Sequence, residues 1–190
     1  MANKTNTKEK ILLTSLHLFA QHGYEAVSVS TISGELGITK GALYKHFKNK
    51  QDIFDKIVER MFQVDAQRAQ QYNAEEDLKN FTLAQLSFWT EDPFAADFRK
   101  MLALERYRNE KMEELYHSIL TAGPVSYMEH VFREMMSKGL LKQDDALQLA
   151  LEYYAPLYLL IEIWDSAAEK VELSQLLETQ IDRFIQTHTV

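Results

Sequence analysis

Apolar residues recur through most of this chain at the three- and four-residue spacing of an α-helix. The first stripe, from Ile11 to Phe19, predicts a helix over about 7–22. A longer stripe follows Asn49, a capping residue, and predicts a helix that continues to about residue 71. No stretch alternates apolar and polar residues as a half-buried strand would. We therefore expect an all-α protein of nine or ten helices.

Proline, glycine and lysine positions divide the rest of the chain into further helical segments. We expect breaks near 92–93, 123–124, 138–139 and 170. The remaining helices are then expected at about 75–90, 94–107, 110–121, 124–138, 144–168 and 172–187.

The segment 28–47 combines two short helices with a turn. Ser28 and Thr39 can each cap a helix, because a side-chain hydroxyl accepts an N–H of the first turn. Gly37 allows the left-handed backbone of the turn between them. This order of elements is typical of a helix-turn-helix. The expected inward face consists of Ile32, Leu36, Ile38, Leu43 and Phe47. The outward face of the second helix, expected over 40–47, consists of Lys40, Ala42, Tyr44, Lys45 and His46.

The charge is unevenly distributed along the chain. Residues 1–60 contain nine Lys and Arg against six Asp and Glu, a net charge of +3. The remainder contains twelve against twenty-two, a net charge of −10, so the chain carries −7. A basic end on an acidic protein favours DNA binding confined to that end, although a local excess of +3 can also arise by chance.

The first fifty-odd residues resemble the N-terminal domain of the TetR family of transcriptional regulators. The signature runs from Ile11 to Lys50 as IL–S––LF–––GY–––SV–TI–––LGITKGALYKHFKNK. The resemblance implies a helix-turn-helix DNA-binding domain over 1–51, followed by an all-α effector-binding and dimerisation domain over 52–190. It also implies a homodimeric repressor that a small-molecule effector releases from a palindromic operator.

The resemblance assigns DNA contacts residue by residue. Thr39, Tyr44, His46 and Lys50 match positions that commonly hold phosphates. Lys40, Gly41, Ala42 and Lys45 match positions near base edges, and Ser28 and Ser30 match further backbone-contacting positions. The chemistry agrees, since a lysine can donate to guanine and an alanine methyl can meet a thymine methyl.

The effector site is expected among aromatic and flexible apolar residues on the helices that line pockets in the family. These residues are Phe88, Trp89, Phe98, Met101, Tyr127, Tyr154 and Tyr158. Glu105 and Glu162 would add negative charge, which favours a hydrophobic cation stacked on aromatic rings. The alternative is that the aromatic residues belong to an ordinary core and the acids to a solvated face.

The helix expected over 144–168 has two apolar faces. One contains Leu147, Leu151, Tyr154, Tyr158 and Ile161, and the other contains Leu149, Tyr153, Pro156, Leu160 and Ile163. Because burial in one subunit needs a single stripe, a second face favours a homodimer through the last two helices. The alternative is a central helix buried within a monomer.

Other classes of function find little support in the sequence. The chain lacks Cys, a phosphate loop, a nucleophile elbow and any paired His spacing typical of a metal site, so we expect no enzyme and no cofactor. No apolar run reaches the roughly 18 residues of a membrane span, and no N-terminal signal segment is present, so we expect a cytoplasmic protein. A constitutive or protein-controlled DNA-binding factor without an inducer remains an alternative.

Overall fold

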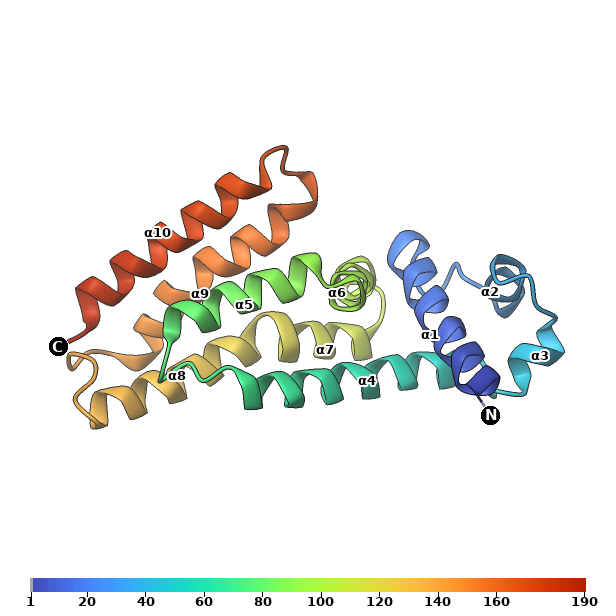
Figure 1. Cartoon of the computed structure of the whole chain (residues 1–190), viewed down its shortest axis with the longest axis horizontal. Coiled ribbons are helices and arrows are strands. Elements are labelled where there is room, and N and C mark those ends of the chain that lie inside the picture. The colour runs from blue at the N-terminus through green and yellow to red at the C-terminus, as the bar shows by residue number, and fades with distance from the viewer. Residues whose placement is uncertain (1) are drawn as a thin grey trace. The chain divides into compact units, whose positions relative to one another are not determined.

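The computed structural model describes residues 2–190, apart from the side chains of residues 2–6 and 69. Within these residues the chain forms ten α-helices, one short 3₁₀ turn and no β-strand (Figure 1). The expected all-α fold is confirmed. The helices are α1 (Ala2–His22), α2 (Val29–Glu35), α3 (Lys40–Tyr44), α4 (Lys50–Gln71), α5 (Leu78–Glu91), α6 (Pro93–Glu105), α7 (Glu110–Leu120), α8 (Ala122–Ser137), α9 (Ala146–Ile163) and α10 (Lys170–His188).

The helices gather into two compact units. The first consists of residues 1–68 together with 93–113, and the second consists of residues 69–92 together with 114–190. The first unit is therefore discontinuous in sequence. These units are defined by packing. The division by function into residues 1–51 and 52–190 stays a prediction.

In the first unit, α1 packs along α6 and against α2. Its core includes the fully buried side chains of Phe19, Ile57 and Met101. Ser15 is buried in the same core, where its hydroxyl donates to the carbonyl of Ile11 at 2.6 Å. Burial of this serine costs little folding free energy, because its hydroxyl forms a hydrogen bond within its own helix.

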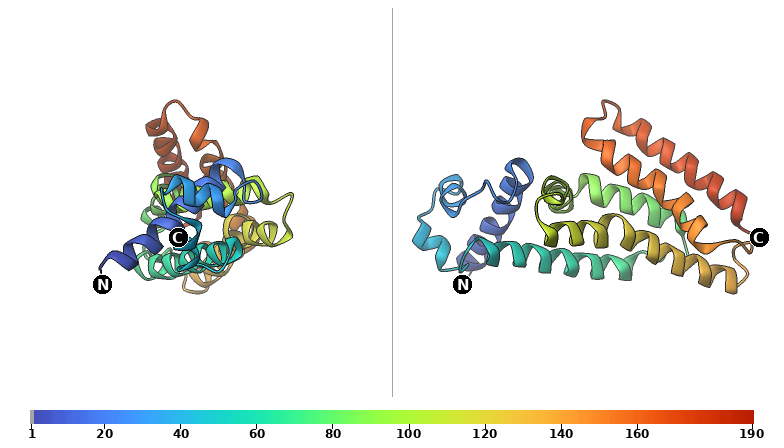
Figure 2. Two further views of the ribbon diagram at one scale, coloured as in Figure 1. Left: turned by 90° about the vertical axis from the view of Figure 1, so that its right-hand side faces the viewer. Right: turned by 180° about the vertical axis from the view of Figure 1, so that it is seen from behind.

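In the second unit, α8 packs against α9, which also contacts α5 and α10. Figure 2 shows α9 and α10 side by side in this unit. The rings of Phe132, Tyr153 and Phe184 meet at centroid distances of 5.4–5.7 Å and join α8, α9 and α10. The end of the chain is fixed by a bridge between Leu141 and Thr189.

Several expected helix boundaries differ from the structure, and two of them have an identifiable cause or replacement. Only Thr121 separates α7 from α8, because Gly123 lacks a Cβ that would overlap the carbonyl oxygen of Ser118. The helix expected to reach residue 168 ends at Ile163, and a 3₁₀ turn at Trp164–Ser166 follows it. Among the described residues, none of the helices is both long enough and apolar enough to span a membrane.

Candidate nucleic-acid interface and effector site

Side-chain caps start both short helices of the expected helix-turn-helix. The Ser28 hydroxyl accepts the backbone N–H of Thr31 at 3.1 Å, and the Thr39 hydroxyl accepts that of Ala42 at 3.1 Å. Between the helices, Gly37 has φ 63°, a conformation that favours glycine. The second helix, α3, is shorter than expected and ends at Tyr44. The capped helix-turn-helix is thus present where the sequence predicted it.

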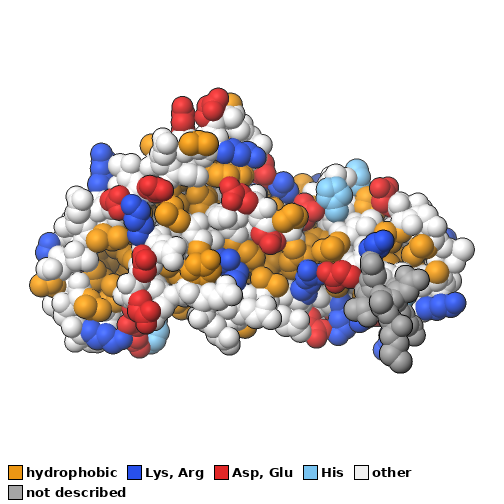
Figure 3. All heavy atoms as spheres, viewed as in Figure 1, with side chains coloured by type: hydrophobic (Ala, Val, Ile, Leu, Met, Phe, Trp, Pro, Cys, Tyr) orange, Lys and Arg blue, Asp and Glu red, His pale blue; other side chains and the backbone are white. Residues whose placement is uncertain are grey.

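The outward face of α3 is exposed as expected. Lys40, Gly41 and Lys45 are exposed, and Tyr44 has 52% of its surface accessible. Ala42 and His46 are half-buried. On the inward side, Ile32, Leu43 and Phe47 are buried, whereas Leu36 and Ile38 are only half-buried. Figure 3 shows Lys and Arg side chains around this end of the first unit.

The capping hydroxyls keep a donor for DNA. In its cap, the Thr39 oxygen accepts a hydrogen bond, so its own O–H can still donate to a phosphate. Ser28 shares a further hydrogen bond with the Thr31 hydroxyl at 2.9 Å. Ser30 is exposed on the first turn of α2. These positions are compatible with the phosphate contacts expected of them.

Lys50 is less free than the sequence suggested. Its ammonium group donates to the carbonyl of Tyr24 at 2.8 Å and of Glu25 at 3.4 Å, and lies 4.1 Å from the centre of the Tyr24 ring. Its side chain is 22% exposed. Lys50 therefore fastens the start of α4 to the turn after α1, a role that its sequence neighbours do not reveal. A phosphate contact by Lys50 stays a prediction.

Tyr24 forms the other half of this junction. Burial raises the pKa of its hydroxyl to about 12, with smaller contributions from the negative charges of Glu25 and Asp55. The hydroxyl donates to the side-chain oxygen of Gln51 at 3.1 Å. Tyr24 thus joins the turn after α1 to the first turn of α4 through its ring, its carbonyl and its hydroxyl.

The start of α4 is fixed by a reciprocal cap. The Asn49 side chain accepts the N–H of Asp52 at 2.8 Å, and the Asp52 carboxylate accepts the N–H of Lys48 at 2.8 Å. The expected cap at Asn49 is confirmed. Because Lys48 and Asn49 lie in the short segment between α3 and α4, this cap also helps to fix the position of α3 relative to α4.

Two short capped helices joined by a glycine turn, with a cationic and aromatic outer face on the second, form a helix-turn-helix, the arrangement with which many proteins bind DNA. Residues 11–57 match the bacterial regulatory proteins of the tetR family. Over these residues the chain is similar to the TetR family, and the match covers about a quarter of its length.

Similar proteins agree with this assignment over the N-terminal part. The chain is 39% identical over 71 residues to the HTH-type transcriptional regulator YerO of Bacillus subtilis (strain 168), which covers 37% of the chain and 24% of YerO. It is 42% identical over 64 residues to the HTH-type transcriptional regulator AcrR of Shigella flexneri, covering 31% of the chain and 30% of AcrR. The matched part thus spans less than a third of either relative.

The fold extends the similarity to the rest of the chain. SmeT, solved as a complex with triclosan, superposes with a TM-score of 0.72 over 97% of this chain and 92% of its own. The sequence identity is 21%, so this likeness concerns the fold alone.

The residues expected at the effector site do not form one group within a unit. In the second unit, Phe88 and Trp89 are buried with ring centroids 4.9 Å apart, while Tyr127 is half exposed and lies beside Phe81. Phe98, Met101 and Glu105 belong to α6 of the first unit and are all buried.

Tyr154 and Tyr158 belong to a hydrogen-bonded cluster between α7 and α9. The Tyr154 hydroxyl donates to the carbonyl of Leu120 at 2.7 Å, at the end of α7. The hydroxyls of Tyr158 and Tyr116 lie 2.6 Å apart, and Tyr116 also donates to Glu162 at 3.3 Å. Burial raises the pKa of Tyr154 well above its usual value. The sequence alone does not single out Tyr116, since nothing local distinguishes it from other core aromatic residues.

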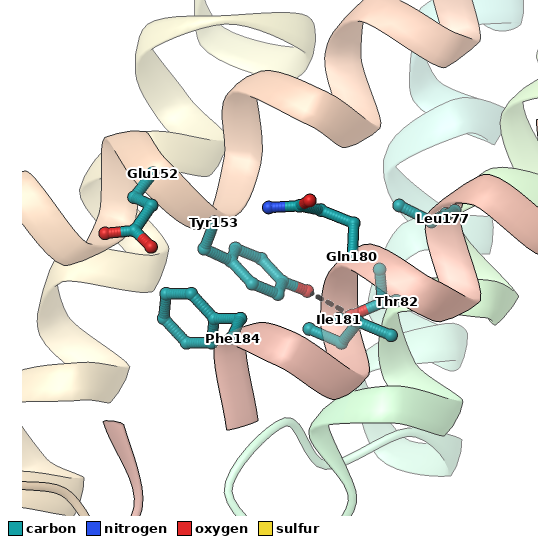
Figure 4. A pocket seen from close by; sticks show the side chains of 7 residues that line it. All are labelled: Thr82, Glu152, Tyr153, Leu177, Gln180, Ile181 and Phe184. Carbon is teal, nitrogen blue, oxygen red and sulfur yellow. Dashed lines mark hydrogen bonds between the residues drawn. The ribbon is translucent and has the colours of Figure 1, made fainter. Parts of the chain in front are cut away.

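A small cavity lies elsewhere, between α5, α9 and α10 (Figure 4). Its volume of about 10 Å³ is enough for roughly one water molecule. Thr82 and Tyr153, whose hydroxyls lie 2.6 Å apart, face it together with Gln180. None of the residues expected to bind the effector lines this cavity.

Proposed function

We propose that this chain is a homodimeric repressor that binds a palindromic operator through α3 and is released by a small-molecule effector. The exposed outer face of α3, with Lys40, Tyr44 and Lys45 accessible on a helix fixed at both ends, is the observation that supports DNA binding most directly. Lys45 and Lys40 would donate to guanine edges, and Thr39 and Tyr44 would hold phosphates. The α3 helices of the two subunits would reach successive major grooves about 34 Å apart.

An apolar ridge on α9 supports a homodimer. Residues four apart along this helix are exposed, with Leu147 43%, Leu151 44%, Leu159 57% and Ile163 38% accessible. Ala155 continues the same spacing and is also exposed. Such an i±4 ridge packs into the groove of a second helix. The opposite side of α9 buries Leu149, Tyr153, Leu157 and Leu160 within its own unit. The two faces differ from those expected, because Tyr154 and Ile161 are buried whereas Ile163 is exposed. The exposed ridge nevertheless offers an apolar surface to a partner copy.

The similarity in fold supports an effector-binding role for the rest of the chain. SmeT, which shares the fold, was solved with triclosan, and this supports a small-molecule effector here. The effector would bind better to a dimer whose α3 helices are wrongly spaced for the operator. Repression would then fall by an amount set by that difference in affinity.

Selection of bound fragments from a random DNA pool tests this function. We expect a palindromic consensus bound by a dimer, and compounds that release it should bind the free protein. Recovery of fragments without any shared sequence, at an affinity equal to that for random DNA, would contradict the proposal. A sequence-specific dimer that no compound releases would favour the constitutive alternative.

A further inference from the structure

Lys8 lies near the start of α1, on the side of the helix that faces the core. It precedes Ile11 by three residues and Leu12 by four, so it continues the buried stripe of α1 toward the N-terminus. Ile11 and Leu12 are buried, whereas Lys8 is exposed. The Lys8 side chain therefore points to the same side of α1 as the core and emerges where that core ends.

An aromatic ring from the end of the helix-turn-helix lies next to Lys8. The Lys8 ammonium group stands 5.8 Å from the centre of the Phe47 ring. Phe47 follows α3 by three residues and is itself buried. Because 5.8 Å is close to the limit of a cation–π contact, the ring holds the ammonium group only weakly. Lys8 thus brings a positive charge from α1 to the segment that directly follows α3.

Two further lysines carry positive charge in the same segment. Lys45 and Lys48 stand on either side of Phe47 in the sequence, and both are exposed. Within the described part of the chain, neither of them forms an ion pair, and neither does Lys8. Lysines of the first unit that do have an acidic partner are Lys50, Lys56 and Lys111.

The acidic residues nearest in sequence have other partners. Glu9 pairs with Arg60 of α4. The Asp52 carboxylate accepts the backbone N–H of Lys48 as part of the cap of α4. Neither carboxylate forms an ion pair with the ammonium group of Lys8 or Lys48. Uncompensated positive charge therefore lies beside the helix that would enter the DNA groove.

Lys10 offers a comparison on the same helix. It is exposed and, among the residues that the structure describes, it forms no ion pair. Two residues along an α-helix correspond to a rotation of about 200°, so Lys10 points away from the side on which Lys8 meets Phe47. The two lysines thus share charge, helix and exposure, and they differ in direction.

We propose that Lys8 and Lys48 hold phosphate groups of the DNA strand that borders the major groove entered by α3. The proposal rests on DNA binding through α3 and extends the contact surface to the start of α1, which precedes the signature beginning at Ile11. Each ammonium group donates to a phosphate oxygen and releases a counterion. Because phosphate contacts carry no sequence information, the two lysines strengthen binding to any sequence and position α3 for its base contacts.

The salt dependence of DNA binding by the full-length protein tests these contacts. The probes are two fluorescent duplexes of about 30 base pairs, one with the selected palindromic consensus and one with the same bases scrambled. Because a dimer would lose two contacts, Lys8→Ala should make the slope of log affinity against log salt shallower by about 1.8 on both duplexes. At about 0.1 M salt its affinity for each duplex should fall at least about tenfold. Lys48→Ala should have a similar effect, and the double variant should lose about 3.6 from the slope.

Two control variants separate a phosphate contact from a change in net charge. Lys10→Ala removes the same charge from the same helix and should keep the wild-type slope. Lys8→Arg keeps the charge at the contact and should also keep the slope. An unchanged slope in Lys8→Ala or Lys48→Ala, or equal losses in Lys8→Ala and Lys10→Ala, would overturn the proposal. A loss confined to the consensus duplex would overturn it as well, since it would indicate base readout.

Thermal unfolding separates the contact from a structural role. The melting temperature of Lys8→Ala should match that of the wild type, because the Phe47 ring holds the ammonium group only weakly. A lower melting temperature with an unchanged salt slope would assign Lys8 to the packing of α1 and overturn the proposal.

The outcome also separates these contacts from the proposed function. Wild-type slopes in all variants contradict the contacts and leave DNA binding through α3 intact. A wild-type protein that binds neither duplex contradicts both.

Discussion

Lys45 and Lys50 lie close together in sequence, but their ammonium groups have different surroundings. Lys45 is exposed at the end of α3, where its ammonium group can donate hydrogen bonds to solvent or to DNA. Lys50 already donates to two carbonyls and lies over the Tyr24 ring. The sequence predicts both as DNA contacts, but it cannot reveal the second arrangement, because Tyr24 lies far away along the chain and meets Lys50 only in the folded unit.

Lys45→Ala and Lys50→Ala should therefore weaken operator binding in different ways. Loss of Lys45 should relax the base preference at one position of the operator. It should weaken the binding free energy for the preferred sequence by about 1–3 kcal/mol. Loss of Lys50 should weaken specific and scrambled sites by similar factors and also lower the melting temperature. Binding titrations with both DNAs and thermal unfolding measure these effects. Equal effects of both variants on both DNAs would show that the roles are wrongly assigned.

Gly34→Ala should stabilise the protein. Gly34 lies in α2, its φ is not in the left-handed region, and a Cβ there would have no heavy atom within 4 Å. Because glycine is costly inside a helix, alanine should raise the free energy of unfolding by about 0.5–1 kcal/mol. Denaturant unfolding measures the change. Gly37→Ala is the contrasting control, since φ 63° penalises alanine there. Stabilisation by both substitutions would contradict this account.

The buried tyrosines predict a loss of stability in alkali. Burial raises the pKa of Tyr24 from 10.0 to about 12 and raises those of Tyr153 and Tyr154 as well. Between pH 10 and 12 the folded state therefore binds more protons than the unfolded state, so the free energy of unfolding falls as pH rises through this range. Absorbance of the phenolate should show these tyrosines ionising only with unfolding. Tyr24→Phe should reduce the dependence, and an unchanged slope in that variant would contradict the assignment.

At the scale of helices, the sequence predicted elements well where local chemistry decides them. Ser28, Thr39 and Asn49 cap the helices expected to follow them, because each cap involves only residues a few positions away. The ends of longer helices depend on tertiary packing, so the sequence predicts them less accurately. The break at Gly123 is an example, since a close approach to Ser118 and not a loop separates α7 from α8.

The ridge on α9 predicts the effect of a charge on assembly. Leu159→Asp places a carboxylate on the most exposed position of the ridge, so burial against a second copy would cost several kcal/mol by desolvation. The variant should sediment as a monomer at concentrations where the wild type is a dimer, and its operator affinity should fall with it. Leu13→Asp, exposed on α1 and outside the last two helices, is a control for added surface charge. A Leu159→Asp dimer as stable as wild type would contradict the interface.

At the scale of the whole molecule, a net charge of −7 limits nonspecific attraction to DNA. With a charge of +3 in residues 1–60, a dimer should neutralise only about six phosphates, so the logarithm of the operator affinity should fall with the logarithm of salt at a slope of about −5. Binding titrations between low and moderate salt measure this slope. A slope near −10 would show that further basic residues reach the DNA.

The expected effector site stays a prediction, and its residues are divided between the two units. The sequence suggests aromatic residues for this site only through their positions on the expected helices. In the structure Phe88 and Trp89 pack on one another, and the Tyr154 hydroxyl donates to the last carbonyl of α7. Only contacts between distant helices distinguish a core tyrosine from a binding residue. Glu105 was recognisable as an acid within an apolar helix, but the lack of a hydrogen-bond partner for its Oε2 atom among the described residues and its contact with Gly23 appear only in the folded unit.

The discontinuity of the first unit has a consequence for synthesis. Its α1 packs along α6, yet residues 69–92, which belong to the other unit, are made between them. A nascent chain that has released residues up to 68 still lacks α6, the helix along which α1 packs. The helices up to α4 are thus synthesised before the helix that completes their packing. A fragment cut after α4 would lack the helix that shields its own core.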